Sequence, residues 1–368
     1  MENRVKEPLI HITRRGFVSL KRAVLIRIIA VAVALLVSGL LAFLLIERLS
    51  ESPERIGEFY KCFIDGIFST GELVWTYFKD VAVLLCIALA VTPAFKMRFW
   101  NIGAEGQTLV GMLAAIAVSF YLGGELNNGL LLVLMLIAAV IAGAIWAFIP
   151  AFFKAMWNTN ETLFTLMMNY VATFLVSFVL LQWVPSGNAL GILEHGWMPS
   201  VIHDYFLIIL ITGLMTIALG IYLNYSKQGY EIAVVGESER TAKYVGINVK
   251  KVIIRTMVLS GVLCGLAGFL IGAGLDHSIT SESIEGRGFT AIMVSWLAKF
   301  KPMFMVVTAA LIVFLETGAS QISETFDVQG AMPDIIVGII LFFIIGCEFF
   351  LNYEVHFRHR NRAEKEEI

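Results

Sequence analysis

Long runs of apolar residues separated by short polar stretches dominate this chain. The first run covers residues 23–46 and is interrupted only by Arg27 near its start. A helix needs about 20 apolar residues to cross a bilayer, so each run predicts a transmembrane helix. Nine further crossings are predicted near residues 81–95, 104–122, 129–153, 163–183, 206–224, 253–274, 288–298, 302–318 and 333–351. The pattern therefore predicts an all-α membrane protein of about ten transmembrane helices.

Two of the predicted crossings, 81–95 and 288–298, are short for a bilayer. Short or interrupted segments in the two halves of a chain are typical of transporters with internal repeats, where they lie near the transport path. The first run, by contrast, is too long for the apolar core of a cleavable signal peptide, and no small-residue cleavage site follows it. We expect it to stay in the membrane as the first helix.

The basic residues give the orientation. Ten crossings with both termini in the cytoplasm place 22 of the 27 lysines and arginines inside, as the positive-inside rule requires. The predicted organisation is a basic cytoplasmic segment at 1–22, a membrane domain at 23–351 and a charged cytoplasmic tail at 352–368. An outer acidic segment at 47–80 and a cytoplasmic loop at 225–252 interrupt the membrane domain.

Composition agrees with this class and excludes several functions. Hydrophobic residues make up 58% of the chain and charged residues only 15%, against about 25% charged in soluble domains. The net charge of −2 argues against nucleic-acid binding. The sequence contains no P-loop motif and no H-E-x-x-H motif, so we expect neither a nucleotide site, a metal site nor any other cofactor in this chain.

The cysteines are scattered and form no C-x-x-C pair. Small buried apolar side chains are the expected role for most of them. Cys62 is the exception, because it belongs to the outer segment and should react with an impermeant thiol reagent. Cys264, inside an apolar run, should stay protected.

Polar residues gather where the predicted third helix begins. Asn101, Glu105 and Gln107 place two amides and a carboxylate within seven residues. Polar groups next to a membrane span are costly and usually mark a path or a packing contact. The alternative is local: Asn101 as a helix cap, with Glu105 favoured by the helix dipole. Both interpretations stay open from the sequence.

A second polar group leads into the run at 163–183. Asn160 or Thr162 is explained by capping, but Asn169 lies about two turns inside the span and is followed by Tyr170. An amide at that depth needs a partner on another helix or a polar cavity. Asn169 is thus a candidate for the solute path, with Tyr170 as a stacking surface, or a residue that holds two helices together.

The cytoplasmic loop contains a short capped helix. Ser238 is suited to the cap, Glu239 to the first turn and Gly246 to the stop. A helix of two turns is not stable alone, so we expect it to dock onto a partner. Ala242 and Val245, three residues apart, would enter that partner together. The alternative is an ordinary loop helix resting on the bilayer.

These three regions resemble the permease subunits of ABC importers in the branch that carries ribose-type sugars and purine nucleosides. The matching stretches are Asn-Ile-Gly-Ala-Glu-Gly-Gln at 101–107, Asn-Glu-Thr-Leu…Met-Met-Asn-Tyr at 160–170, and Gly-Glu-Ser…Ala…Tyr-Val-Gly-Ile at 236–247. The first is more similar to the nucleoside-type permeases than to the ribose permeases. The resemblance covers roughly residues 80–350, and the first 80 residues resemble nothing in the family.

The resemblance implies a bacterial inner-membrane protein of ten helices, with an architecture like that of the cobalamin-importer permease. It implies two permease subunits, two separate ATP-hydrolysing subunits and an extracellular solute-binding lipoprotein. The segment that would couple to the ATPase consists of Gly236, Glu237, Ser238, Ala242, Tyr244, Val245 and Gly246. The solute stays open, because sugar and riboflavin relatives look alike at these motifs.

Two other classes compete with this interpretation. An ion-coupled secondary transporter or channel for a small polar solute would favour an Asp, Lys or Arg near the centre of a span, and none is predicted there. A polytopic membrane enzyme would need a cluster of His, Asp and Glu at one depth, and none is visible. An ABC permease without a nucleotide site of its own is the function that the sequence favours.

Overall fold

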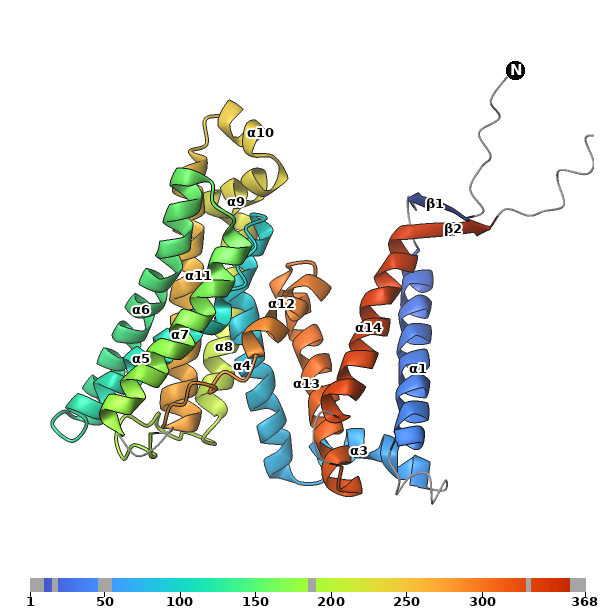
Figure 1. Cartoon of the computed structure of the whole chain (residues 1–368), viewed down its shortest axis with the longest axis horizontal. Coiled ribbons are helices and arrows are strands. Elements are labelled where there is room, and N and C mark those ends of the chain that lie inside the picture. The colour runs from blue at the N-terminus through green and yellow to red at the C-terminus, as the bar shows by residue number, and fades with distance from the viewer. Residues whose placement is uncertain (1–9, 15–18, 46–54, 185–189, 329–331, 358–368) are drawn as a thin grey trace, which may run out of the picture. The chain divides into compact units, whose positions relative to one another are not determined.

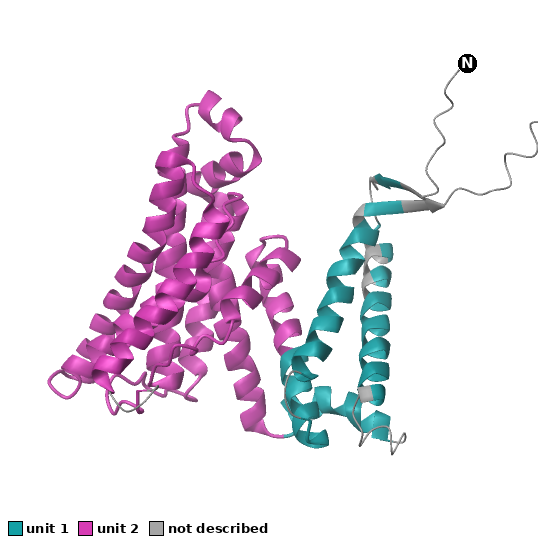
Figure 2. Ribbon diagram, in the orientation of Figure 1, with its two compact units in different colours: residues 1–69, 315–368 teal, residues 70–314 magenta. Residues whose placement is uncertain are grey.

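A computed structural model describes residues 10–14, 19–45, 55–184, 190–328 and 332–357. The chain divides into two compact units, one of residues 1–69 with 315–368 and the other of residues 70–314 (Figure 2). Each unit is described by itself.

The larger unit is an array of helices (Figure 1). Its elements are α4 (Gly71–Lys96), α5 (Ala104–Leu122), α6 (Asn128–Trp157), α7 (Glu161–Trp183), α8 (Phe206–Tyr225), α9 (Lys227–Glu237), α10 (Glu239–Tyr244), α11 (Val249–Ile271), the π-helical turn η2 (Gly272–Asp276), α12 (Arg287–Leu297) and the first part of α13 (Pro302–Phe326). The face of this unit that carries α9 and α10 is called the α10 side.

Small residues let three helices of this unit approach closely. A Cβ added to Gly143 of α6 would lie 2.3 Å from the Gly261 carbonyl of α11, and one added to Gly265 would lie 2.2 Å from the Ala139 carbonyl. Gly268 of α11 is equally close to α5 at the Thr108 carbonyl. Membrane helices associate through such backbone contacts because lipid supplies no hydrophobic driving force between them. The helices α5, α6 and α11 are therefore packed tightly against one another, and the most buried helix of the unit is α4, in which every residue from Val81 to Phe95 is buried.

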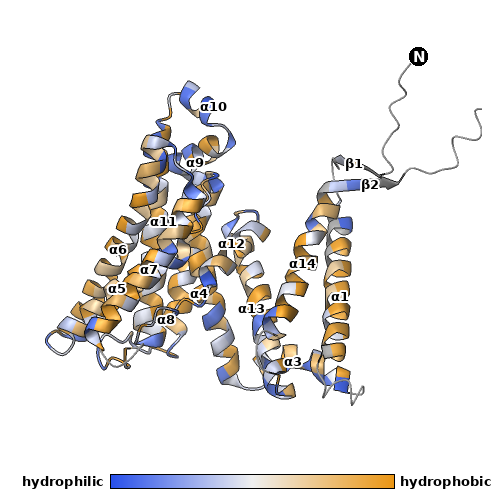
Figure 3. Ribbon diagram, in the orientation of Figure 1, coloured by the Kyte–Doolittle hydropathy of each residue, from blue (hydrophilic) through white to orange (hydrophobic). Residues whose placement is uncertain are grey.

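Hydrophobic residues occupy most of the length of the membrane helices (Figure 3), and many large apolar side chains are exposed. Along α6, Val133, Ile137 and Ile141 are exposed, whereas the small residues Ala139 and Gly143 are buried. This distribution is the reverse of that in a soluble protein and fits a lipid environment. Among the described residues, eight helices are long and apolar enough to span a membrane: α4, α5, α6, α7, α8, α11 with η2, α13 and α14. The described apolar stretch of α1, Ile28–Leu44, is shorter.

The two short predicted crossings have different outcomes. The run at 81–95 is the inner part of α4, which begins ten residues earlier with Thr70 as its cap and is long enough to span. The run at 288–298 is α12, whose 11 residues cover only about 16 Å, roughly half of a bilayer core. The prediction of a full helix there is wrong.

Residues 277–297 nevertheless lead back toward the α10 side, partly without helix. After η2, His277 and Ile279 bond to the loop at 190–193, on the face opposite the α10 side. Residues 277–286 then lead to the start of α12. At the other end of α12, Ser295 donates to the Ala88 carbonyl of α4 and Phe300 stacks on Phe95, near the α10 side. Irregular backbone at membrane depth is tolerated where protein buries it or a cavity hydrates it.

The smaller unit contains α1 (Leu20–Leu45), α3 (Ile56–Phe68), the end of α13, α14 (Met332–Asn352) and two strands, β1 (Ile10–Arg14) and β2 (Tyr353–Phe357). The helix α1 packs against α14. The helix α3 lies in the segment predicted to be an outer loop, and Phe63 packs on Gly318 of α13. Cys62 is buried and contacts Thr325, so the expectation that it is freely accessible is wrong.

The strands form a two-stranded antiparallel sheet in which Ile10 pairs with Phe357 and Arg14 with Tyr353. The all-α prediction did not include this sheet. It joins a part of the basic segment at 1–22 to a part of the charged tail at 352–368 through backbone hydrogen bonds.

Candidate functional site

The predicted path residues lie in the larger unit, around the start of α5. Residues 97–103 connect α4 to α5 without forming a helix. Asn101 is fully buried in this connection. Its Oδ1 accepts from the Gly103 amide and from Nε2 of Gln107, both at 3.1 Å. Its Nδ2 donates to Oε1 of Gln107 and to Oγ of Ser260 on α11, both at 3.2 Å. Asn101 and Gln107 thus form hydrogen bonds with each other, and Asn101 ties the connection between α4 and α5 to α11.

Asn169 ties the start of α5 and the connection before it to α7. It is 6% exposed; its Oδ1 accepts from the Gly106 amide at 2.9 Å, and its Nδ2 donates to the Ile102 carbonyl at 2.9 Å. Both partners are backbone groups at the start of α5, where a helix leaves its own amides unpaired. This geometry matches the interpretation of Asn169 as a residue that holds two helices together. The adjacent Tyr170 is 56% exposed and points away from this network.

Glu105 joins α5 to the short helix α12. Its two carboxylate oxygens accept from the Gly286 amide at 2.8 Å and from the Gly288 amide at 2.7 Å. Gly286, at φ +74°, precedes α12 and has no side chain to cap it. A carboxylate at a helix start is favoured by the helix dipole and by charge-assisted hydrogen bonds. Glu105 therefore caps a helix that is 181 residues away in sequence.

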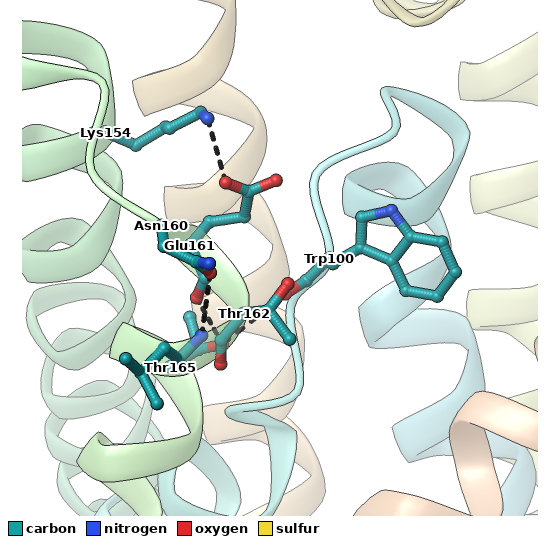
Figure 4. Close-up of polar contacts among 7 residues, drawn as sticks. Trp100, Lys154, Asn160, Glu161, Thr162 and Thr165 are labelled. Atoms are coloured by element: carbon teal, nitrogen blue, oxygen red, sulfur yellow. Dashed lines mark hydrogen bonds and ion pairs between the residues drawn. The ribbon is translucent and has the colours of Figure 1, made fainter.

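The second predicted polar group lies at the start of α7 and links this helix to its neighbours (Figure 4). Asn160 caps the helix by accepting from the Leu163 amide at 3.1 Å. Glu161 forms an ion pair of 2.8 Å with Lys154 of α6, in which both side chains are largely buried. The hydroxyl of Thr165 accepts from the Ile102 amide at 3.1 Å. These contacts connect α6, α7 and the connection before α5 into one assembly.

Four of the five predicted path residues are therefore brought together, and all four bond to non-helical backbone or to one another. Within the described residues, their hydrogen-bonding groups are largely used by the protein. They hold the start of α5 and of α12, where the chain departs from regular helix inside the bilayer. The predicted residues thus lie around two irregular segments of the larger unit, and their role in a transport path stays a prediction.

A charged cluster near the same segments was missed by sequence reasoning. Asp80 of α4 lies 3.3 Å from Lys79 and 3.8 Å from Arg287 at the start of α12, and Arg287 also pairs with Glu285. Lys79, Asp80 and Arg287 are half-buried. The prediction had placed residues 71–80 outside the membrane, whereas the structure includes them in α4. Lys79 and Asp80 therefore belong to the first half of a helix long enough to span, which the sequence reasoning did not predict.

The predicted short capped helix is present as α10, and its role in coupling stays a prediction. Oγ of Ser238 accepts from the Thr241 amide at 3.2 Å, and Gly246 follows the helix at φ +83°, a conformation that favours glycine. The helix α9, which precedes it, was not predicted. Gly236 at the end of α9 contacts the end of α4, because an added Cβ would lie 2.3 Å from the Lys96 carbonyl. The segment is therefore fixed to a membrane helix at its base.

The exposed face of α10 differs from the prediction. Ala242 is fully buried within the chain, whereas Tyr244 is 93% and Val245 is 56% exposed. The expectation that Ala242 and Val245 share a docking face is wrong. Tyr244 and Val245 form the apolar part of the surface available to a partner, and Glu237 beside them is exposed as well.

Comparison with known proteins settles the class of this assembly. Residues 74–345 match the family described as the permease component of branched-chain amino acid transport systems. The chain belongs to this family. The match begins within α4 and ends within α14, so α1, α3 and β1 lie outside it. This agrees with the resemblance, which covers roughly residues 80–350.

Similar proteins within this permease family are ABC transporter subunits. The guanosine permease NupP of Bacillus subtilis is 30% identical over 77% of this chain and 84% of its own length. The glucose permease TsgB13 of Haloferax volcanii is 28% identical over 80% of this chain and 81% of its own length. The nucleoside permease NupB of Lactococcus lactis is 27% identical over 77% of this chain and 80% of its own length. The chain is a multi-pass permease of the nucleoside and sugar branch of ABC transporters.

Proposed function

We propose that this permease forms the translocation path for a nucleoside, or a simple sugar, in an ATP-driven importer of the bacterial plasma membrane. The similarity to NupP, extending over most of both chains, carries this proposal. Both kinds of solute are neutral and rich in hydrogen-bonding groups. The buried polar side chains that bond at the start of α5, Asn101, Gln107, Asn169 and Ser260, are correspondingly amides and a hydroxyl.

The energy would come from another chain. The sequence carries no P-loop, so ATP would be bound and hydrolysed by separate ATPase subunits. Tyr244 and Val245 of α10, projecting from a segment fixed to α4 through Gly236, would contact such a subunit. A second permease subunit, identical or homologous, would complete the path, and an extracellular solute-binding lipoprotein would deliver the solute.

In this arrangement the predicted path residues have two tasks. Asn101, Gln107 and Asn169 would hold the irregular backbone beside the path, and Glu105 would hold α12. Tyr170, exposed on the single chain, remains available to a solute or to the second permease.

The test is transport by the assembled complex. The permease is co-expressed with candidate ATPase, second-permease and binding-lipoprotein subunits from the same organism, and the complex is reconstituted in vesicles. Uptake of radiolabelled guanosine, uridine, ribose and glucose is measured with and without ATP. We expect ATP-dependent uptake of a nucleoside, with a sugar as the second outcome. Uptake by the permease alone, driven by an ion gradient, would support the secondary-transporter alternative and overturn the proposal.

A further inference from the structure

A small cavity opens at the base of the coupling segment, between α9 and the start of α11. Its volume is about 260 Å³, and it is bordered by residues 245–248 of the loop after α10. Its charged lining residues are Lys227 and Glu231 of α9 and Lys251 and Arg255 of α11. Three cations face one carboxylate, so the empty cavity has an uncompensated positive charge that would attract an anion.

Only some of the charged groups that line this cavity form hydrogen bonds or ion pairs within the described residues. A terminal nitrogen of Arg255 donates to Glu231 at 3.0 Å. Nε of Arg255 is buried and has no hydrogen-bond partner among the described residues. The guanidinium group of Arg255 lines the cavity, so an anion in the cavity would place a negative charge beside it. The start of α11 also borders the cavity at its cap residue Asn248, and a helix start favours negative charge.

The cavity lies at the level where a membrane ends. Arg255 is at the edge of the predicted crossing 253–274, and the preceding helix α8 ends at Tyr225, which is 85% exposed. Tyr230 of α9 is exposed as well. Exposed tyrosines of this kind are typical of the headgroup region. Basic pockets between helices on the cytoplasmic side are a known form of phospholipid headgroup site.

We propose that this cavity binds the phosphate group of an anionic phospholipid at the α10 side of the membrane. Lys227, Lys251 and the guanidinium group of Arg255 would provide the positive charges and donors, and the acyl chains would lie along the exposed apolar face of α8. Because residues 245–248 form one wall, an occupied cavity would stiffen the base of α10. The proposal does not depend on which solute the permease carries.

Native mass spectrometry of the full-length protein tests this site. The protein is released from nanodiscs containing phosphatidylglycerol and phosphatidylcholine in equal amounts. We expect one retained phosphatidylglycerol per permease in the wild type and at least tenfold weaker retention in the Lys227→Gln, Lys251→Gln double variant. Lys250→Gln is the matched control, because Lys250 is exposed on the same helix turn and does not line the cavity. Lys251→Arg keeps the charge and should retain the lipid.

Several results would overturn the proposal. Equal losses in Lys250→Gln and the double variant would mean general surface attraction. Displacement by millimolar inorganic phosphate would identify a soluble phosphate as the ligand. No preference for phosphatidylglycerol, combined with loss of ATPase association in Lys251→Gln, would assign the cavity to a carboxylate of the ATPase. The thermal midpoint of each variant shows whether it is folded, and the single Lys227→Gln variant replaces the double one if that is unstable.

Discussion

In this permease, buried amide side chains form hydrogen bonds with backbone groups that have no partner within a helix. Asn169 bonds to one amide and one carbonyl at the start of α5, and Asn101 bridges the same region to α11. In lipid, backbone groups without partners cost several kcal/mol each, so these side chains allow the chain to leave the helical conformation at that depth. The sequence located these residues correctly, but it could not distinguish a path from such support.

Replacing Asn169 with leucine should mainly affect folding. The variant leaves the Gly106 amide and the Ile102 carbonyl without partners, each at a cost of about 1–3 kcal/mol. We expect a lower thermal midpoint and lower folded yield in detergent, with uptake per folded complex reduced less than yield. The control Tyr170→Leu removes a larger but exposed side chain and should leave the midpoint unchanged. A normal midpoint with uptake reduced several-fold would instead place Asn169 in the path.

His277 makes the outer loops sensitive to acid. Its ring stacks on Trp197 with centroids 4.0 Å apart. Burial lowers the pKa of His277 below its usual value, while Asp204 opposes this. His277 therefore binds a proton less readily in the folded state than in the unfolded state. Its contribution to the free energy of unfolding falls as the pH drops below about 6.5. Trp fluorescence should change with a midpoint below that value.

The variant His277→Gln should lack this fluorescence step. The control His203→Gln removes a second stack, between His203 and Trp75, and should leave the step in place. A step that persists in His277→Gln would assign it to another group.

At the scale of elements, the apolar runs predicted where most helices lie, but not the full length of each helix or which of its residues are buried. The helix α3 was missed because its apolar face is divided by charges. Its buried residues nevertheless follow helical spacing: Phe59, Cys62, Phe63, Gly66 and Ile67. The length of α4 was missed because Lys79 and Asp80 interrupt its apolar sequence, and the π-turn before α12 has no sequence signal. Burial of Ala242 was unpredictable, because a six-residue helix has two possible apolar faces.

The attachment of α12 through Glu105 can be tested directly. Glu105→Gln keeps the size of the side chain but replaces one acceptor oxygen with a donor, so only one of the two amides retains a partner. Hydrogen bonds to charged groups contribute about 1.5–3 kcal/mol, so the protection of residues 286–290 against hydrogen exchange should fall by roughly tenfold or more. Glu125→Gln, at an exposed loop position, is the control. Unchanged protection in Glu105→Gln would contradict the capping role.

Two variants of α10 with contrasting expected effects test its role in coupling. Tyr244→Ala removes an exposed ring and should leave the fold intact while weakening association with the ATPase several-fold. Ala242→Glu instead places a charge in a fully buried position and should destabilise the segment itself. Thermal midpoints and co-purification with the ATPase separate the two effects. Normal association and transport by Tyr244→Ala would remove this face from the contact.

At the scale of the molecule, the number of crossings depends on the chain between η2 and α13. The positive charges predict an inside–outside alternation that requires ten crossings, one of which must include residues 277–297. Only α12 is helical in this segment, so the segment contains no helix of sufficient length to span a bilayer. The charge pattern depends on where the loops lie and not on how the chain crosses, and the ten crossings stay a prediction.

Single cysteines can test this crossing in intact cells. All four native cysteines are buried, so an impermeant maleimide should label the wild type weakly, including at Cys62. Glu125→Cys, in the loop after α5, should be labelled from outside. Lys301→Cys, between α12 and α13 and exposed, should be labelled only after the cells are opened. If Lys301→Cys reacts from outside, residues 277–297 form a re-entrant segment that returns to the same side, and every position after α12 changes sides.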